Sequence, residues 1–236
     1  MNRLNSSVIL LALVLPTVVT LAYFVLLAGQ ASTLQQAAYG GGKAVQFALP
    51  AICTALVLRE RIRAALPDRR GLLMGLCFGL PVATVMLGLY HMWLKPAGLL
   101  ASAGNAVSQK VLDLGMNTPW RFAAMGLFYA SCHSLLEEYY WRWFVFSQLR
   151  RRQTLPTAIL ISSCGFMAHH VIVLGTFFGW TNPMTYLFSL AVAAGGAAWA
   201  WIYERSGSLY GPWLSHLLVD AAIFLIGYDL VRCHLG

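Results

Sequence analysis

The sequence is dominated by apolar runs of about 20 residues, long enough to cross a hydrocarbon core of about 30 Å as helices. Seven spans are predicted, near residues 8–28, 36–58, 72–94, 121–148, 155–178, 183–203 and 208–231. Only 10% of the 236 residues are charged and 59% are hydrophobic, whereas soluble domains carry about 25% charged residues. We therefore predict an all-α fold, a polytopic integral membrane bundle of about seven transmembrane helices, with residues 1–236 forming a single transmembrane domain. The longest loop, 95–120, is expected to hold a short interfacial helix.

Basic residues give the chain a net charge of +8, and they gather at the ends of alternate spans. If the seven spans alternate, one side holds Arg3, Arg59, Arg61, Arg63, Arg69, Arg70, Arg150, Arg151, Arg152 and Arg205. The opposite side holds Lys95, Lys110 and Arg232. This asymmetry predicts a cytoplasmic N-terminus and an outer C-terminus in a bacterial inner membrane. The arginines are expected to contact anionic lipid, and no nucleic-acid partner is predicted because no basic face is interleaved with stacking aromatics.

Two adjacent glutamates, Glu137 and Glu138, lie inside the predicted span RFAAMGLFYASCHSLLEEYYWRWFVFSQL. An ionised side chain at the bilayer centre costs roughly 2.5–3.5 kcal/mol on insertion scales, so such residues usually mark a pathway or a reactive site. Arg142 follows Glu138 by one helical turn and can hold a carboxylate. His133 lies one turn before Glu137 and is expected to be a hydrogen-bonding neighbour. This span therefore predicts a charged functional cluster within the membrane.

Two further spans carry polar residues of the same kind. The fifth contains His169 and His170 in GFMAHH, and the seventh contains His216 and Asp220, one turn apart, in SHLLVDAAIF. A membrane bundle seldom places such groups against lipid, so we expect them to converge with the glutamates between mid-membrane and the outer half. Lys43, in the second span, is expected to snorkel or to pair with a polar partner.

Three segments, in order and on separate spans, resemble the motifs of the CPBP family of CAAX proteases and bacteriocin-processing enzymes, also called the ABI family. Residues 137–142 (EEYYWR) resemble its EExxxR motif, 166–170 (FMAHH) its FxxxH motif and 216–220 (HLLVD) its HxxxN motif. The resemblance covers about residues 120–230, the protease-like core. It implies a helical intramembrane glutamic endopeptidase.

The resemblance also implies roles for the first two motifs. Glu137 would be the general base that activates water, and His170 would share that water. Glu138 and Arg142 would orient the site. The motif FxxxH selects His170, which we favour, whereas aligning GFMAH on the family's common FGLAH selects His169.

The third motif departs from the family pattern at one position. The resemblance implies that His216 and residue 220 polarise the scissile carbonyl and hold the oxyanion. Position 220 is Asp220, where the family often has asparagine, and an ionised carboxylate cannot donate a hydrogen bond. Asp220 would instead fix the tautomer of His216, or donate only when protonated.

No cofactor is expected. Zn²⁺ held by Glu137, His170, His216 and Asp220 is the alternative, but the sequence has no HExxH motif and the family resemblance favours metal-free chemistry. The expected partners are membrane lipid and a membrane-anchored protein or peptide substrate, either prenylated, bacteriocin-like or carrying a C-terminal sorting signal. Two other functions stay open, a non-proteolytic immunity or scaffold membrane protein and, less favoured, a proton-coupled transporter. The transporter is disfavoured because the polar residues form one patch and no inverted repeat is visible.

Overall fold

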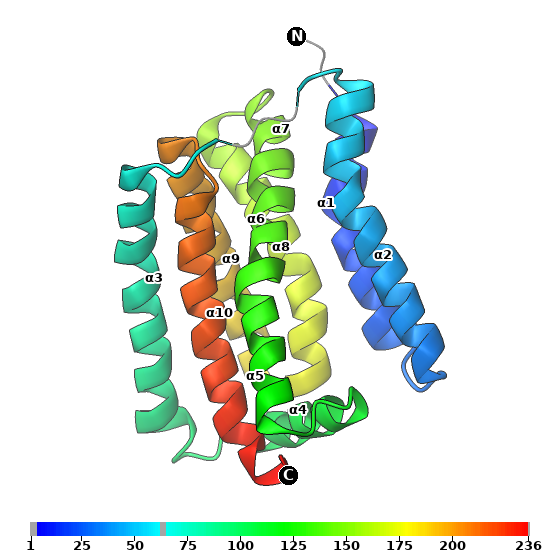
Figure 1. Cartoon of the computed structure of the whole chain (residues 1–236), viewed down its shortest axis with the longest axis vertical. Helices are drawn as coiled ribbons and strands as arrows, with labels where there is room; N and C mark the ends of the chain where they lie inside the picture. The colour runs from blue at the N-terminus through cyan, green and yellow to red at the C-terminus, as the bar shows by residue number, and fades with distance from the viewer. Residues whose placement is uncertain (1–3, 62–64, 236) are drawn as a thin grey trace.

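A computed structural model describes residues 4–61 and 65–235, and these residues form helices joined by short loops. Figure 1 shows the helices side by side along one axis, except α4. The α-helices are α1 (Ser6–Leu21), α2 (Ser32–Ile52), α3 (Arg69–Leu89), α4 (Ala101–Asp113), α5 (Pro119–Phe128), α6 (Ser134–Glu138), α7 (Ser147–Arg150), α8 (Leu155–Phe178), α9 (Pro183–Ser206) and α10 (Tyr210–Val231). Wider π-helical turns are η1 (Ala22–Leu26), η2 (Cys53–Val57), η3 (Tyr90–Leu94), η4 (Tyr129–His133) and η5 (Tyr139–Phe146), and a 3₁₀ turn, η6 (Arg232–His234), ends the chain.

The predicted helical membrane bundle is confirmed. Within the described residues, 6 helices are long and apolar enough to cross a membrane. The remaining predicted span, 121–148, is the helical run from α5 to α7, which extends along the height of the bundle in Figure 1. It is not among these six helices, and it carries Glu137, Glu138 and Arg142. The helix least suited to lipid by composition is therefore the one placed inside the bundle.

The run from α5 to α7 is irregular around the two glutamates. Turns η4 and η5 lie directly before and after α6, which ends in Glu137 and Glu138. The other π-helical turns of the described chain extend the ends of α1, α2 and α3. Short π-helical segments inside helices occur frequently at functional sites, because each one rotates the side chains that follow it.

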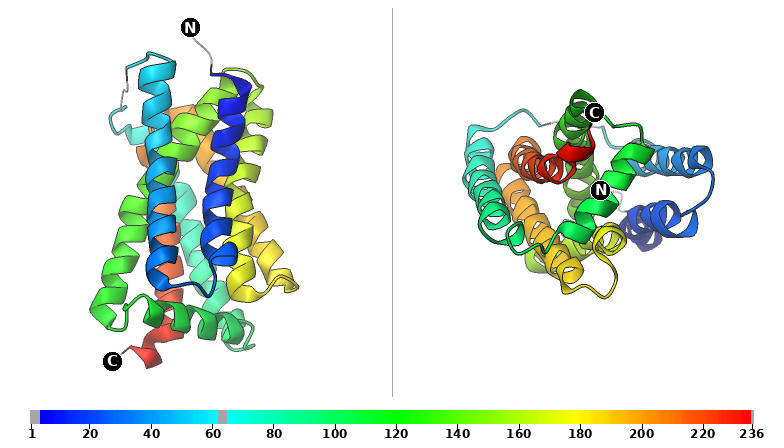
Figure 2. Two further views of the ribbon diagram at one scale, coloured as in Figure 1. Left: turned by 90° about the vertical axis from the view of Figure 1, so that its right-hand side faces the viewer. Right: turned by 90° about the horizontal axis from the view of Figure 1, so that it is seen from below.

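The outer helices frame this central run. Figure 2 shows α1 and α2 as a hairpin at one edge of the bundle and α3 at the other edge, beside α10. Helix α4 lies across the end of the bundle that holds the C-terminus, as expected for an interfacial helix (Figures 1 and 2). Helix α1 begins at the opposite end.

Three consecutive arginines at the end of the central run each contact a different segment, at the end of the bundle where α1 begins. Arg150 Nη2 lies 2.9 Å from Glu204 Oε1, and Arg151 Nη2 lies 2.8 Å from Glu60 Oε2. Arg152 donates to the carbonyl of Leu4. The hydrogen bonds from Arg151 lower the pKa of the Glu60 carboxyl.

These contacts bring Arg150, Arg151 and Arg152 to the same end of the bundle as the segments around Leu4, Glu60 and Glu204. The sequence predicted that the arginine-rich ends of alternate spans lie on one side. Arg3 and Arg63 lie outside the described residues. Which side of the membrane this end faces stays a prediction.

Glycines allow α3 and α10 to approach closely. A Cβ added at Gly75 would lie 2.2 Å from the carbonyl oxygen of Gly211, and one added at Gly79 would lie 2.9 Å from Cα of Ser215. In lipid, where no hydrophobic effect pulls helices together, such small residues permit the backbone contact that holds a helix pair.

Gly75→Ala tests this contact, with Gly88→Ala in the same helix as its control. A Cβ at Gly88 meets nothing within 4 Å. We expect Gly75→Ala to lower the free energy of unfolding by about 1–3 kcal/mol through overpacking, while Gly88→Ala leaves it unchanged or raises it by about 0.5–1 kcal/mol. Thermal unfolding of the detergent-solubilised protein measures both. Equal stability of the two variants would show that the α3–α10 contact is not tight.

Candidate active site

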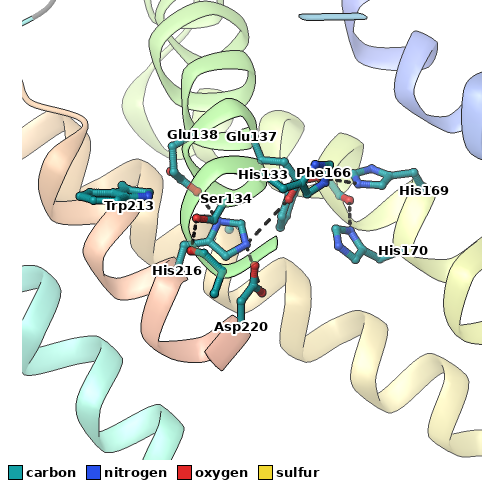
Figure 3. Close-up of polar contacts among 12 residues, drawn as sticks. His133, Ser134, Glu137, Glu138, Phe166, His169, His170, Trp213, His216 and Asp220 are labelled. Carbon is teal, nitrogen blue, oxygen red and sulfur yellow. Dashed lines mark hydrogen bonds and ion pairs between the residues drawn. The ribbon is translucent and has the colours of Figure 1, made fainter. Parts of the chain in front are cut away.

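The carboxylate of Glu137 is surrounded by imidazoles from three helical segments. Its side chain is only 6% exposed, and Oε1 lies 3.5 Å from Nε2 of His133 (η4) and 3.5 Å from Nε2 of His169 (α8). Its other oxygen, Oε2, lies 3.8 Å from Nε2 of His216 (α10). Figure 3 shows the four side chains pointing toward one another. The convergence of the three motif-bearing spans is therefore present in the structure.

Glu138 orients His216. Glu138 is fully buried at 0% exposure, and its Oε1 lies 2.8 Å from Nδ1 of His216. A carboxylate only accepts hydrogen bonds, so Nδ1–H is the donor of this pair. Nε2 therefore faces the space between Glu137 and Asp220. It lies 3.6 Å from Oδ1 of Asp220. The indole of Trp199 stacks on the imidazole with ring centroids 4.1 Å apart.

Arg142 contacts the same oxygen of Glu138 as His216 does. Its Nη1 lies 3.1 Å from Glu138 Oε1, and its Nη2 donates to the carbonyl of Gly196 at 3.3 Å. The guanidinium carbon lies 4.7 Å from the ring centroid of Phe166 and 5.1 Å from that of Trp199. Arg142 thus ties the central run to α8 and α9, as expected of a residue that orients the site.

The structure distinguishes the two adjacent histidines. His169 is buried, stacks on Trp141 with rings 5° from parallel and presents Nε2 to Glu137. His170 instead places Nδ1 2.9 Å from the carbonyl oxygen of Phe166, on its own helix. Consecutive helical residues point about 100° apart, so only one of the two can face Glu137. The sequence favoured His170, but the neighbour of Glu137 is His169.

Asp220 does not set the tautomer of His216 through Nδ1, one of the roles considered from the sequence. That nitrogen is bonded to Glu138, and Asp220 stands on the Nε2 side. The side chain of Asp220 is 19% exposed, against 6% for Glu137. Asp220 is therefore the more open of the two carboxylates near Nε2.

Sequence reasoning missed the contribution of α9. Trp199 stacks on His216 and donates from Nε1 to Ser215 Oγ at 2.9 Å. A Cβ added at Gly196 would lie 3.3 Å from Phe166 and 3.4 Å from Arg142 Nη2, so glycine allows this close approach. Tryptophan and glycine are common in membrane helices, and nothing in the α9 sequence signals these roles.

The zinc alternative requires at least three ligands around one point. In the part of the chain that the structure describes, no group of three or more His, Cys, Asp or Glu side chains is arranged to hold a metal ion. His170, one of the four proposed ligands, bonds to its own helix. Metal-free chemistry stays a prediction.

Residues 119–222 match the model of a family described as Rce1-like type II CAAX prenyl endopeptidases. This region of the chain is therefore similar to the Rce1-like CAAX proteases. The match confirms the resemblance to the CPBP family and includes every site residue predicted from the sequence. No curated protein and no solved structure matches the chain. Its long apolar helices make the chain an integral membrane protein, and residues 119–222 resemble a protease family.

Arg142→Ala tests whether the buried ion pair supports the fold. Removing one partner of a buried pair costs about 3–5 kcal/mol, and we expect the lower end because His216 still contacts Glu138. Arg150→Ala is the control, since Arg150 and Glu204 are 32% and 29% exposed and exposed pairs contribute about 0–1 kcal/mol. Thermal unfolding in detergent compares the two. A loss no larger in Arg142→Ala than in Arg150→Ala would contradict a structural role for Arg142.

Proposed function

We propose that the chain is an intramembrane endopeptidase in which Glu137 activates water to hydrolyse a peptide bond near a membrane anchor. The observation that carries this proposal is the buried Glu137 carboxylate, faced by imidazoles of His133, His169 and His216. Buried glutamates with convergent polar partners are rare in membrane helices and are usually functional. The match to the CAAX protease family supports hydrolysis over transport or scaffolding.

In the proposed reaction, a water molecule gives a proton to Glu137 as its oxygen bonds to the peptide carbonyl carbon. Oε1 is the assigned base, because His169 and His133 lie beside it and can position the water. The tetrahedral intermediate then collapses, the C–N bond breaks and Glu137 returns the proton to the leaving nitrogen. General acid–base catalysis of this kind contributes about 10²–10⁴-fold.

His216 is the proposed donor to the oxyanion. Its Nδ1–H is committed to Glu138, so a doubly protonated ring presents Nε2–H beside Glu137 and Asp220. Trp199 and Glu138 fix the ring before the substrate binds, and a donor that need not reorient stabilises a developing charge most effectively. Glu138, Arg142 and Trp199 are thus positioning residues.

The proposed partners are membrane lipid and a peptide or protein held at the membrane. Prenylated, bacteriocin-like and C-terminal sorting-signal substrates all fit this description. We also propose a bacterial inner membrane location with the arginine-rich end in the cytoplasm, on the positive-inside pattern.

Glu137→Gln tests the base. The assay follows cleavage of a library of lipid-anchored peptides in membranes that contain the protein. We expect the cleavage rate to fall by about 10²–10⁴-fold, because an amide cannot take the proton. Glu204→Gln, which alters an exposed glutamate at the end of α9, should retain activity. Full activity of Glu137→Gln would rule out this mechanism. Wild-type activity is also expected to survive a chelator, and loss that Zn²⁺ restores would establish the metal alternative instead.

Comparison of His169→Ala with His170→Ala tests which histidine serves Glu137. We expect His169→Ala to lower kcat by about 100-fold or more, because it removes the imidazole at Oε1. His170→Ala should stay within about tenfold of wild type, because His170 contacts its own helix. Single-turnover cleavage measures both, with thermal unfolding as the folding control. The reverse order would restore the assignment from the FxxxH motif.

A further inference from the structure

Lys43 is a cation deep within α2 that has no anionic partner. It lies roughly 16 Å from the start of the helix at 1.5 Å per residue, too deep to snorkel as the sequence suggested. No ion pair or hydrogen bond of its ammonium group is present in the described part of the chain. Its Nζ instead lies 5.6 Å from the ring centroid of Tyr39 and 5.5 Å from that of Phe47. A lysine in this position requires a functional explanation.

Lys43 borders the site on one side of Glu137. The ring of Phe47 lies 6.0 Å from that of His133, which contacts Glu137 Oε1. Lys43 is half-buried, so a ligand can reach it. A cation therefore stands next to the proposed base and remains free for a further anion.

Asp220 approaches Glu137 from the other side. It contacts His216, which faces Oε2, whereas His133 and His169 face Oε1. Figure 3 shows His216 and Asp220 on one side of Glu137 and the other two histidines across from them. A peptide lying across Glu137 thus meets the ammonium group of Lys43 at the α2 side and the His216–Asp220 pair at the α10 side. A peptide carboxylate is attracted to the α2 side.

Helix α2 carries a second polar group without a partner. Gln46, three residues after Lys43 and thus on the same face, is 0% exposed, and neither of its amide atoms is hydrogen-bonded. Buried polar groups nearly always have partners. The inward face of α2 therefore has unused capacity to bind a polar ligand.

We infer that Lys43 is the anion-binding residue of a substrate subsite and takes a peptide carboxylate close to the scissile bond. A phosphate headgroup is excluded as the intended ligand because it stays at the membrane surface, whereas Lys43 lies near mid-span. The carboxylate is supplied either by the C-terminus of the peptide or by an acidic side chain. This inference rests on the proposed function and makes Lys43 a determinant of substrate choice.

The test uses lipid-anchored peptides in matched pairs. In the first pair, one peptide ends in a free carboxylate and the other in an amide. In the second pair, both peptides end in an amide, and one has Glu and the other Gln beside the scissile bond. We expect wild type to prefer the carboxylate member of one pair by about tenfold or more in kcat/KM, the scale of a charge-assisted contact. The pair that shows the preference identifies the source of the carboxylate.

Lys43→Met should remove this preference, because KM should rise more for the carboxylate peptide than for its neutral partner. Lys43→Arg should keep it. Lys110→Met is the matched control. Lys110 Nζ also lies over an aromatic ring, 4.6 Å from the centroid of Tyr23, but Lys110 belongs to α4 and not to α2. We also expect Lys43→Met to raise the melting temperature, since it removes an unpaired charge from the membrane. Equal losses on both peptides, or no wild-type preference in either pair, would overturn the inference.

Binding separates this inference from the proposed function. Fluorescence anisotropy of the same peptides on Glu137→Gln needs no cleavage, and the carboxylate preference should persist there and disappear in Glu137→Gln with Lys43→Met. If Glu137→Gln cleaves like wild type, the mechanism fails while the binding result still decides the subsite. If Glu137→Gln binds both members of each pair equally, the subsite fails whatever the cleavage result.

Discussion

The site depends on a single buried carboxylate that has two cationic or hydrogen-bonding partners. Glu138 contacts Arg142 and His216 at once and so links the central run to α10. Arg142 in turn contacts Phe166 of α8 and Gly196 of α9. Without water to solvate them, these groups must satisfy one another. The arrangement fixes the ring of His216 before a substrate arrives, and this leaves the adjacent Glu137 as the carboxylate that faces the imidazoles and is available for chemistry.

The rotation between consecutive helical residues separates these two roles. Two consecutive residues of a regular helix point about 100° apart. The π-helical turns before and after α6 rotate the neighbouring parts of the central run relative to Glu137 and Glu138. Glu138 faces Arg142 and His216, while Glu137 faces the histidines. Lys43 lies on the α2 side of Glu137, and the His216–Asp220 pair lies on the α10 side. The catalytic proposal and the subsite inference both follow from this asymmetry around one carboxylate.

Much of the fold and the membership of the site could be predicted from the sequence. Apolar length and the cost of unpaired backbone in lipid dictate helices, and polar residues in three spans indicated convergence of Glu137, Glu138, Arg142 and His216. Local pattern could not choose between His169 and His170, because both fit a motif and the choice depends on helix rotation. Nor could it assign Trp199, whose role comes from α9 packing beside α10.

The sequence by itself determined that the chain spans a membrane, that its basic ends lie together and which chemical groups the bundle must shelter, because hydropathy and charge act residue by residue. Only the tertiary structure decided which atoms meet. In the structure, Nδ1 of His216 contacts Glu138, and His169 lies beside Glu137. Lys43 forms no ion pair within the described residues. These outcomes depend on the rotation and spacing of helices far apart in the chain, which glycine contacts such as Gly75 with Gly211 set and no local pattern encodes.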